Sequence, residues 1–135
     1  MKPIGYWLNR TDRAITHYMN NALAEFGLTR LAWQVLNVVR DGGDVADDAV
    51  HSILVANADT ADLDTAISLV LTDGWVSRPA PAHLALTDHG RERLVEVGER
   101  INTFREVSLA GVTDDEYRTA VSVLERMTSN LEARA

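Results

Sequence analysis

Eight aspartates lie between Asp41 and Asp73, and the same segment contains no lysine or arginine. They make up eight of the chain's 20 acidic side chains, so the remainder has 20 − 8 = 12 acids against 13 Lys and Arg. The net charge of −7 is therefore concentrated in one segment. Such a segment repels phosphate and attracts cations or basic protein surfaces. The eight are Asp41, Asp44, Asp47, Asp48, Asp59, Asp62, Asp64 and Asp73.

One group in this segment has spacing that would suit a metal ion. Asp44, Asp47, Asp48 and His51 follow helical steps, and their oxygen and nitrogen donors suit several divalent metals. A solvated acidic face is the commoner meaning of this pattern, so we expect no metal or cofactor. The chain has no cysteine, which excludes disulfides and a thiol nucleophile. No Ser-His-Asp set or glycine-rich phosphate loop stands out, and we expect no enzyme activity.

Helix capping offers a structural explanation for part of the acidity. We predict that Asp44 with Asp47, and Asp59 with Asp62, occupy N-cap and N3 positions, where a carboxylate accepts backbone N–H groups. An N-cap of this kind contributes about 0.5–2 kcal/mol. Asp41 belongs to an Asp-Gly-Gly turn. Capping leaves three acids unexplained: Asp48, Asp64 and Asp73.

The elements that hold these residues follow from apolar side chains at three- and four-residue steps. A chain of 135 residues fits one domain over 1–135. We predict a mainly α fold: a winged helix-turn-helix at about 29–87, with long N- and C-terminal dimerisation helices at about 4–26, 88–110 and 113–133. Within the winged part, helices begin at Thr29, Asp44 and Asp59, and one two-stranded β-hairpin wing joins 75–78 to 83–86.

The apolar runs are too short for a membrane span of ~20 residues, and the first residues lack the apolar core of a signal peptide. We therefore expect no membrane association and a cytoplasmic location.

Three motifs in this order resemble the multiple-antibiotic-resistance regulator (MarR) family over nearly the whole chain. The first is Gly27-Leu28-Thr29 followed by Trp33-Gln34-Val35-Leu36, and the second is Asp73-Gly74-Trp75-Val76. The third is Leu86-Thr87-Asp88-His89-Gly90-Arg91. The resemblance implies a homodimer that places the fourth helix of each subunit in a major groove of operator DNA and the wing near a minor groove. Members are typically repressors that a small, often aromatic, effector releases.

The sequence departs from this family where DNA contacts are expected. Base edges are read mainly by Arg, Lys, Asn and Gln, and the fourth helix offers hydroxyls and carboxylates instead. The family's wing usually carries an Asp-x-Arg pair, whereas this wing reads Pro79-Ala80-Pro81-Ala82. The residues we predict to contact DNA are Thr60, Thr65 and Ser68 on the helix and Arg78 and His83 beside the wing.

The same resemblance indicates an effector pocket among the aromatic residues Tyr6, Trp7, Tyr18, Trp33 and Phe104. Aromatic residues at helical spacing are more often part of a core, and both interpretations remain open. Arg10, Arg13 or Arg105 would supply the charge that an anionic ligand needs. The predicted pocket consists of Tyr6, Arg10, His17, Trp33, Phe104 and Arg105.

Two classes of function follow. The leading hypothesis is a MarR-type transcriptional regulator that binds operator DNA as a homodimer and responds to a small effector. The alternative is a module of the same fold that has lost DNA binding. It would bind a basic protein through its acidic helix-turn-helix, or a small ligand alone. The surroundings of five arginines discriminate between them: Arg30, Arg40, Arg78, Arg91 and Arg93.

Overall fold

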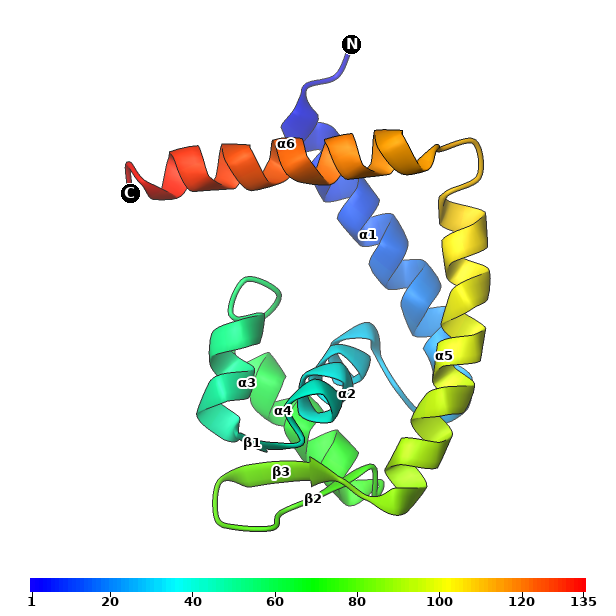
Figure 1. The fold of residues 1–135 in the computed structure, drawn as a ribbon, viewed down its shortest axis with the longest axis vertical. Helices are drawn as coiled ribbons and strands as arrows, with labels where there is room; N and C mark the ends of the chain where they lie inside the picture. The colour runs from blue at the N-terminus through cyan, green and yellow to red at the C-terminus, as the bar shows by residue number, and fades with distance from the viewer. The chain divides into compact units, whose positions relative to one another are not determined.

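The computed structural model describes every residue, Met1–Ala135, in two compact units, Met1–Asn102 and Thr103–Ala135. Figure 1 shows the elements in chain order. They are α1 (Ile4–Leu23), the short 3-10 helix η1 (Ala24–Phe26), α2 (Arg30–Gly42), β1 (Asp44–Ala46), α3 (Asp47–Leu54), α4 (Thr60–Thr72), β2 (Val76–Ser77), β3 (His83–Leu86), α5 (Asp88–Ser108) and α6 (Asp114–Glu132). The predicted mainly helical fold is confirmed.

Side-chain caps begin α2, α4 and α5, as the sequence predicts. The side chain of Thr29 accepts a hydrogen bond from the backbone N–H of Ala32 at the start of α2, and Asp59 accepts from Asp62 at the start of α4. Thr87 does the same for the N–H of Gly90 in α5. Each cap satisfies a donor that has no partner inside its helix. These caps fix where α4 begins and where α5 leaves the wing.

The wing belongs to a three-stranded antiparallel sheet in the order β1-β3-β2. The predicted hairpin is confirmed, with Val76 opposite Leu86. The third strand, β1, was not predicted: Asp44 lies opposite Ala85 on the other edge of β3. The prediction that Asp44 caps the third helix is therefore wrong, because strand pairing takes residues 44–46. Ala46 is the N-cap of α3, without a side-chain cap, and Asp47 is its first residue.

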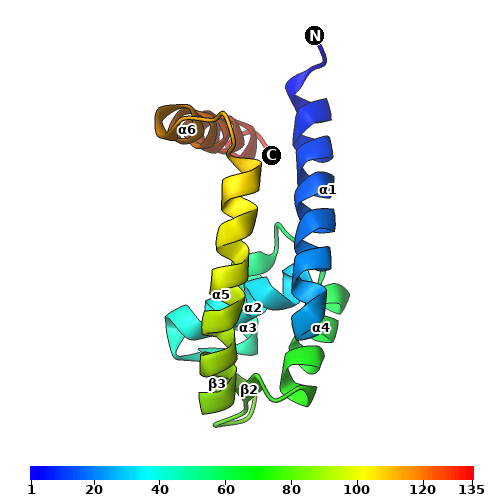
Figure 2. The same cartoon turned by 90° about the vertical axis from the view of Figure 1, so that its right-hand side faces the viewer.

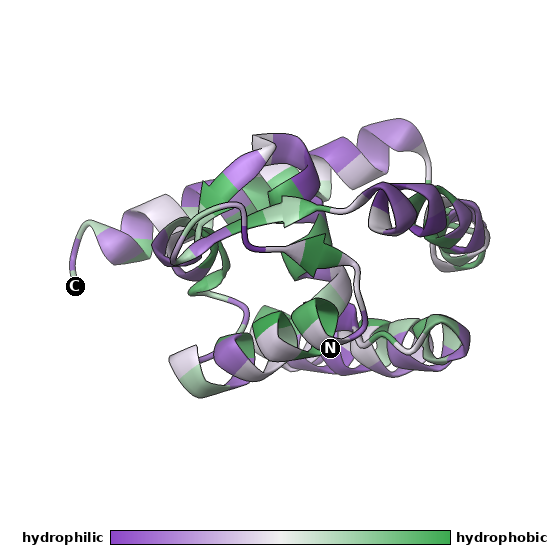
Figure 3. Ribbon diagram, turned by 90° about the horizontal axis from the view of Figure 1, so that it is seen from below, coloured by the Kyte–Doolittle hydropathy of each residue, from purple (hydrophilic) through white to green (hydrophobic).

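The core of the first unit lies among α2, α4 and the sheet, with aliphatic residues at helical steps. Figure 2 shows these elements beside α1 and α5, and in Figure 3 the strands include strongly hydrophobic residues. Trp75, 1% exposed, lies directly before β2. Thr87 joins this point to α5, since its hydroxyl donates to the carbonyl of Gly74 at 2.7 Å. The core includes Leu23, Val35, Leu36, Val39, Val50, Leu63, Ile67, Val70, Leu84 and Val97.

The second unit consists of the end of α5 and the whole of α6. Thr113 and Glu116 form the predicted capping box: each side chain accepts the other's backbone N–H. These hydrogen bonds lower the pKa of Glu116, the backbone bond from Thr113 most of all. No residue of α6 is buried. Neither unit contains a helix long and apolar enough to cross a membrane.

Candidate nucleic-acid interface

The exposed face of α4 carries hydroxyl groups. Leu63, Ile67 and Val70 turn toward the core, which leaves Thr60, Thr65 and Ser68 exposed on the helix. The hydroxyl of Thr65 donates to the carbonyl of Ala61 at 3.0 Å, so it is engaged within its own helix. Thr60 and Ser68 remain available as donors to a phosphate or a base edge.

The acids of α4 are held in two different ways. Asp59 accepts the N–H of Asp62 at 2.8 Å, so a carboxylate already occupies the positive end of this helix. Asp64, on the exposed side, lies 2.8 Å from Nε2 of His51 in α3. Capping and this pair account for Asp59 and Asp64, while the carboxylate of Asp62 faces solvent.

Arg78, the one arginine near the wing, is bound to the first residue of α3. Its Nη1 and Nη2 donate to the two carboxylate oxygens of Asp47 at 2.9 and 3.1 Å, and Nη1 also donates to the carbonyl of His83 at 3.3 Å. The hydrogen bond to Asp47 is the main cause that raises the pKa of Arg78. Such a two-pronged pair fixes the direction of the guanidinium. Arg78 therefore points to the protein's own acid.

His83, the other predicted wing contact, is also paired. Its Nδ1 lies 2.8 Å from a carboxylate oxygen of Asp44 in β1. The backbone N–H of Asp47 donates to the carbonyl of Ala82 at 2.9 Å. We call these contacts among Asp44, Asp47, Arg78, Ala82 and His83 the wing latch. It ties the base of the wing to β1 and to the start of α3.

The other four arginines whose surroundings distinguish the two hypotheses also have partners within the protein. Arg30 binds Asp12 at 2.9 Å, and Arg40 binds its neighbour Asp41. Arg91 binds Asp88, and Arg93 donates to the carbonyl of Phe26 and lies over the ring of Trp75. The pairs of Arg40 and Arg91 are exposed, and such pairs contribute little. The winged part thus carries no arginine without an internal partner.

The residues of the conceivable metal site take other partners. Asp44 pairs with His83, Asp47 with Arg78, and His51 with Asp64. Asp48 makes no ion pair. No group of three or more His, Asp or Glu side chains is placed to hold one metal ion.

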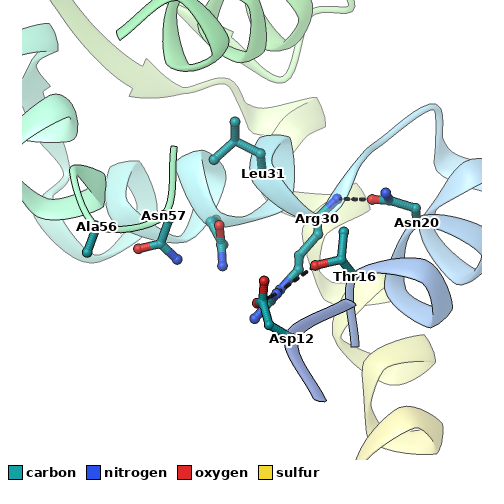
Figure 4. Close-up of a pocket in the computed structure, with 8 residues that line it drawn as sticks. Asp12, Thr16, Asn20, Arg30, Leu31, Ala56 and Asn57 are labelled. Carbon is teal, nitrogen blue, oxygen red and sulfur yellow. Dashed lines mark hydrogen bonds and ion pairs between the residues drawn. The ribbon is translucent and has the colours of Figure 1, made fainter. Parts of the chain in front are cut away.

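A pocket of about 330 Å³ lies beside the start of α2 in the first unit. Figure 4 shows Arg30 reaching from α2 toward Asp12 and Thr16 of α1. The backbone N–H of Arg30 donates to the side chain of Asn20 at 2.7 Å. Gln34 of α2 and Asn57 of the turn before α4 add amide groups. The lining is polar: Asp12, Thr16, Asn20, Arg30, Leu31, Gln34, Ala56 and Asn57.

The predicted pocket residues lie elsewhere, and none of them lines this pocket. Arg10 donates to the hydroxyl of Tyr6 at 2.9 Å and lies over the ring of Trp7. His17 contacts Asn21, and Trp33 is half-buried. Phe104 and Arg105 belong to the second unit, and the pocket of six residues stays a prediction.

Sequence reasoning missed the residues that form the observed pocket, because Asp12, Asn20 and Arg30 come together only when η1 turns the chain between α1 and α2. The one local signal is Thr29, which marks the start of α2 and so places Arg30 in its first turn.

Comparison with protein-family models finds no match, and a search of curated proteins finds none. Solved structures do match. A MarR mutant from E. coli complexed with operator DNA has a TM-score of 0.81 at 19% identity, covering 93% of each chain. A MarR transcriptional regulator from Methanosarcina mazei has a TM-score of 0.82 at 17% identity, covering 98% of this chain and 91% of its own. A MarR family protein from Mycobacterium tuberculosis, in complex with DNA, gives 0.74 at 21%, covering 94% and 98%.

The likeness extends over the winged helix-turn-helix and the long helices that flank it, so the resemblance expected from three short motifs is confirmed in the fold. At these identities it concerns the fold alone. The chain has the MarR-type winged helix-turn-helix fold.

Proposed function

We propose that this protein is a transcriptional regulator that binds operator DNA as a homodimer. The exposed hydroxyl face of α4 carries the proposal, because a winged helix-turn-helix presents its recognition helix to the major groove. The similar E. coli and M. tuberculosis structures are complexes with DNA, which supports the same role here. Thr60 and Ser68 are the proposed donors to the DNA, with Thr65 beside them. Such a protein is not an enzyme, and it acts in the cytoplasm beside its operator.

The charges of the winged part determine how strongly the DNA affinity depends on salt. Each cation that neutralises a phosphate adds about 0.9 to the slope of log affinity against log salt. The arginines of the winged part already have partners, so we expect a smaller slope than a basic relative would give. Hydroxyl contacts would then carry a larger share of the recognition.

Selection of genomic fragments by the purified protein at low salt tests the proposal. Enrichment of one or a few sites, with two half-sites about one helical turn apart, is the expected result. No enriched site at micromolar protein would contradict it.

The homodimer is supported by apolar side chains that are exposed near both ends of the chain. In α1 these include Ile4, Trp7 and Leu8, and in α6 they include Tyr117, Val121 and Leu131. Helices in proteins gain most of their stability from packing an apolar face against other elements, and α6 buries none of its residues in the single chain. A second copy of the chain, related by a two-fold axis, covers both sets in our proposal.

Effector binding is proposed for the polar pocket at Arg30. Its amide groups, together with Arg30 once that arginine releases Asp12, would bind a small acid, and Asn57 lies in the turn that leads into α4. Benzoate serves as the probe: it should raise the melting temperature of the wild type and raise that of an Arg30→Ala variant much less. Equal rises in melting temperature in the two proteins would show that Arg30 does not bind the ligand.

A second candidate function is favoured by the partnered arginines. The acids Asp48 and Asp62 remain without ion pairs, so the winged part presents uncompensated negative charge beside α4. Here the protein would bind a basic protein partner, as complementary charge favours. Pull-downs with the wild type and an Asp48→Asn, Asp62→Asn double variant discriminate: capture that is the same for both excludes this function.

A further inference from the structure

The wing latch joins two stretches of the chain that are distant in sequence, 44–47 and 78–83. Arg78, directly after β2, binds Asp47 at the start of α3, and His83 of β3 contacts Asp44 of β1. Arg78 and His83 are the only basic residues beside the wing turn. Both are bound to aspartates of the acidic segment, Arg78 to Asp47 and His83 to Asp44.

The ion pair of Asp47 with Arg78 is more buried and makes more hydrogen bonds than an ordinary surface ion pair. Asp47 keeps only 23% of its side-chain exposure and Arg78 keeps 38%. Two parallel N–H···O bonds hold the guanidinium in the plane of the carboxylate. The backbone bond from Asp47 to Ala82 holds the wing turn at the same place, so the side-chain pair and the main chain support one arrangement.

We propose that Asp47 is a positioning residue that withholds Arg78 from DNA, so that the wing meets the duplex without a free cation. This inference rests on the proposed DNA binding and specifies how the acidic segment regulates it. An arginine bound to a carboxylate at two points neutralises no phosphate until that carboxylate is given up. The latch thus sets both the affinity and the salt dependence of the proposed complex.

Asp47→Asn is the test variant, and the neighbouring residue supplies the control. Asp47 and Asp48 both lie in the first turn of α3, but Asp48 has no partner in the latch. Asp48→Asn therefore removes the same charge from the same helix end. A double variant, Asp47→Asn with Arg78→Ala, removes the cation that the first substitution releases.

Titration of a fluorescent duplex that carries the selected operator gives the first readout. One added phosphate contact steepens the salt slope by about 0.9. Between roughly 50 and 200 mM salt, Asp47→Asn should therefore lose about 3.5-fold more affinity than Asp48→Asn. It should also bind more tightly at low salt, and the double variant should lose that gain. Equal slopes for Asp47→Asn and Asp48→Asn would overturn the proposal, as would weaker binding by a folded Asp47→Asn variant.

Heparin, a polyanion without base sequence, separates failure of the latch from failure of the proposed function. The latch predicts that Asp47→Asn gains more heparin affinity over the wild type than Asp48→Asn gains, and that the double variant loses this excess. If that holds while no variant binds the operator, the latch stands and the proposed DNA binding falls. If heparin binding is the same for Asp47→Asn and Asp48→Asn, the latch falls.

Discussion

Gly90 lies where α5 passes the base of the wing, and its replacement by alanine tests how these two elements are packed. A Cβ atom built at Gly90 would overlap the carbonyl oxygen of Trp75 and would lie 2.8 Å from the carbonyl carbon. These are backbone atoms, so no side-chain rotation relieves the contact. The Gly90→Ala variant must therefore move α5 away from the segment that enters β2.

Opposing effects decide the sign of the change in stability. Alanine is favoured over glycine inside a helix by about 0.5–1 kcal/mol. Overpacking of a buried site costs about 1–3 kcal/mol. The displacement also strains the hydrogen bonds of Thr87 to the carbonyls of Gly74 and Trp75, and one lost bond costs about 0.5–1.5 kcal/mol. The net result is a destabilisation of about 0.5–4 kcal/mol.

Urea unfolding followed by circular dichroism measures this difference, and Gly98→Ala is the matched control. Gly98 lies in the same helix with nothing within 4 Å of an added Cβ, so its replacement should stabilise the protein by about 0.5–1 kcal/mol. The two substitutions should therefore act with opposite signs. A Gly90→Ala protein as stable as the wild type would refute the packing of α5 against Trp75.

Three further predictions concern α6. Thr113→Ala removes the N-cap and should cost about 0.5–2 kcal/mol of local stability, measured as faster hydrogen exchange of the α6 amides. The pKa of Glu116 is lowered in the folded state, so the stability from its carboxylate is present above the ordinary glutamate range. That stability is lost as the pH falls through the folded pKa, and α6 exchange in Glu116→Gln should lack this acid dependence. Val121→Glu should dissociate the proposed dimer in sedimentation experiments, whereas Thr119→Glu, about half a turn away, should leave it intact; dimers of equal strength would contradict a role for this face.

The helices could be predicted from the sequence because their signals are local. Thr29, Asp59 and Thr113 cap helices through bonds to residues three positions away, and apolar periodicity supplies the rest. The strand β1 could not be predicted in this way. Its three residues pair with β3, almost 40 positions later, and Asp44 has the local pattern of a helix cap.

For the candidate site too, the features set by local sequence could be predicted and those set by strand pairing could not. The hydroxyl face of α4 follows from the spacing of Thr60 and Ser68 in one helix. The partners of Arg78 and His83 do not, because Asp47 and Asp44 reach them only through the pairing of β1 with β3. The sequence shows that the acidic segment has no lysine or arginine. The fold shows in addition that the nearest basic side chains, Arg78 and His83, are bound to aspartates of that segment.

In the proposed complex, α4 contacts operator DNA through its exposed hydroxyl face. The most direct measurement is the affinity of the dimer for its selected operator when Ser68 is replaced by glutamate, compared with Thr119→Glu. Both variants add one negative charge at an exposed position, but only Ser68 lies on α4. Ser68→Glu should lose affinity at least tenfold, about 1.4 kcal/mol, and Thr119→Glu should change it little. Operator binding by Ser68→Glu at the strength of the control would contradict the proposed contact.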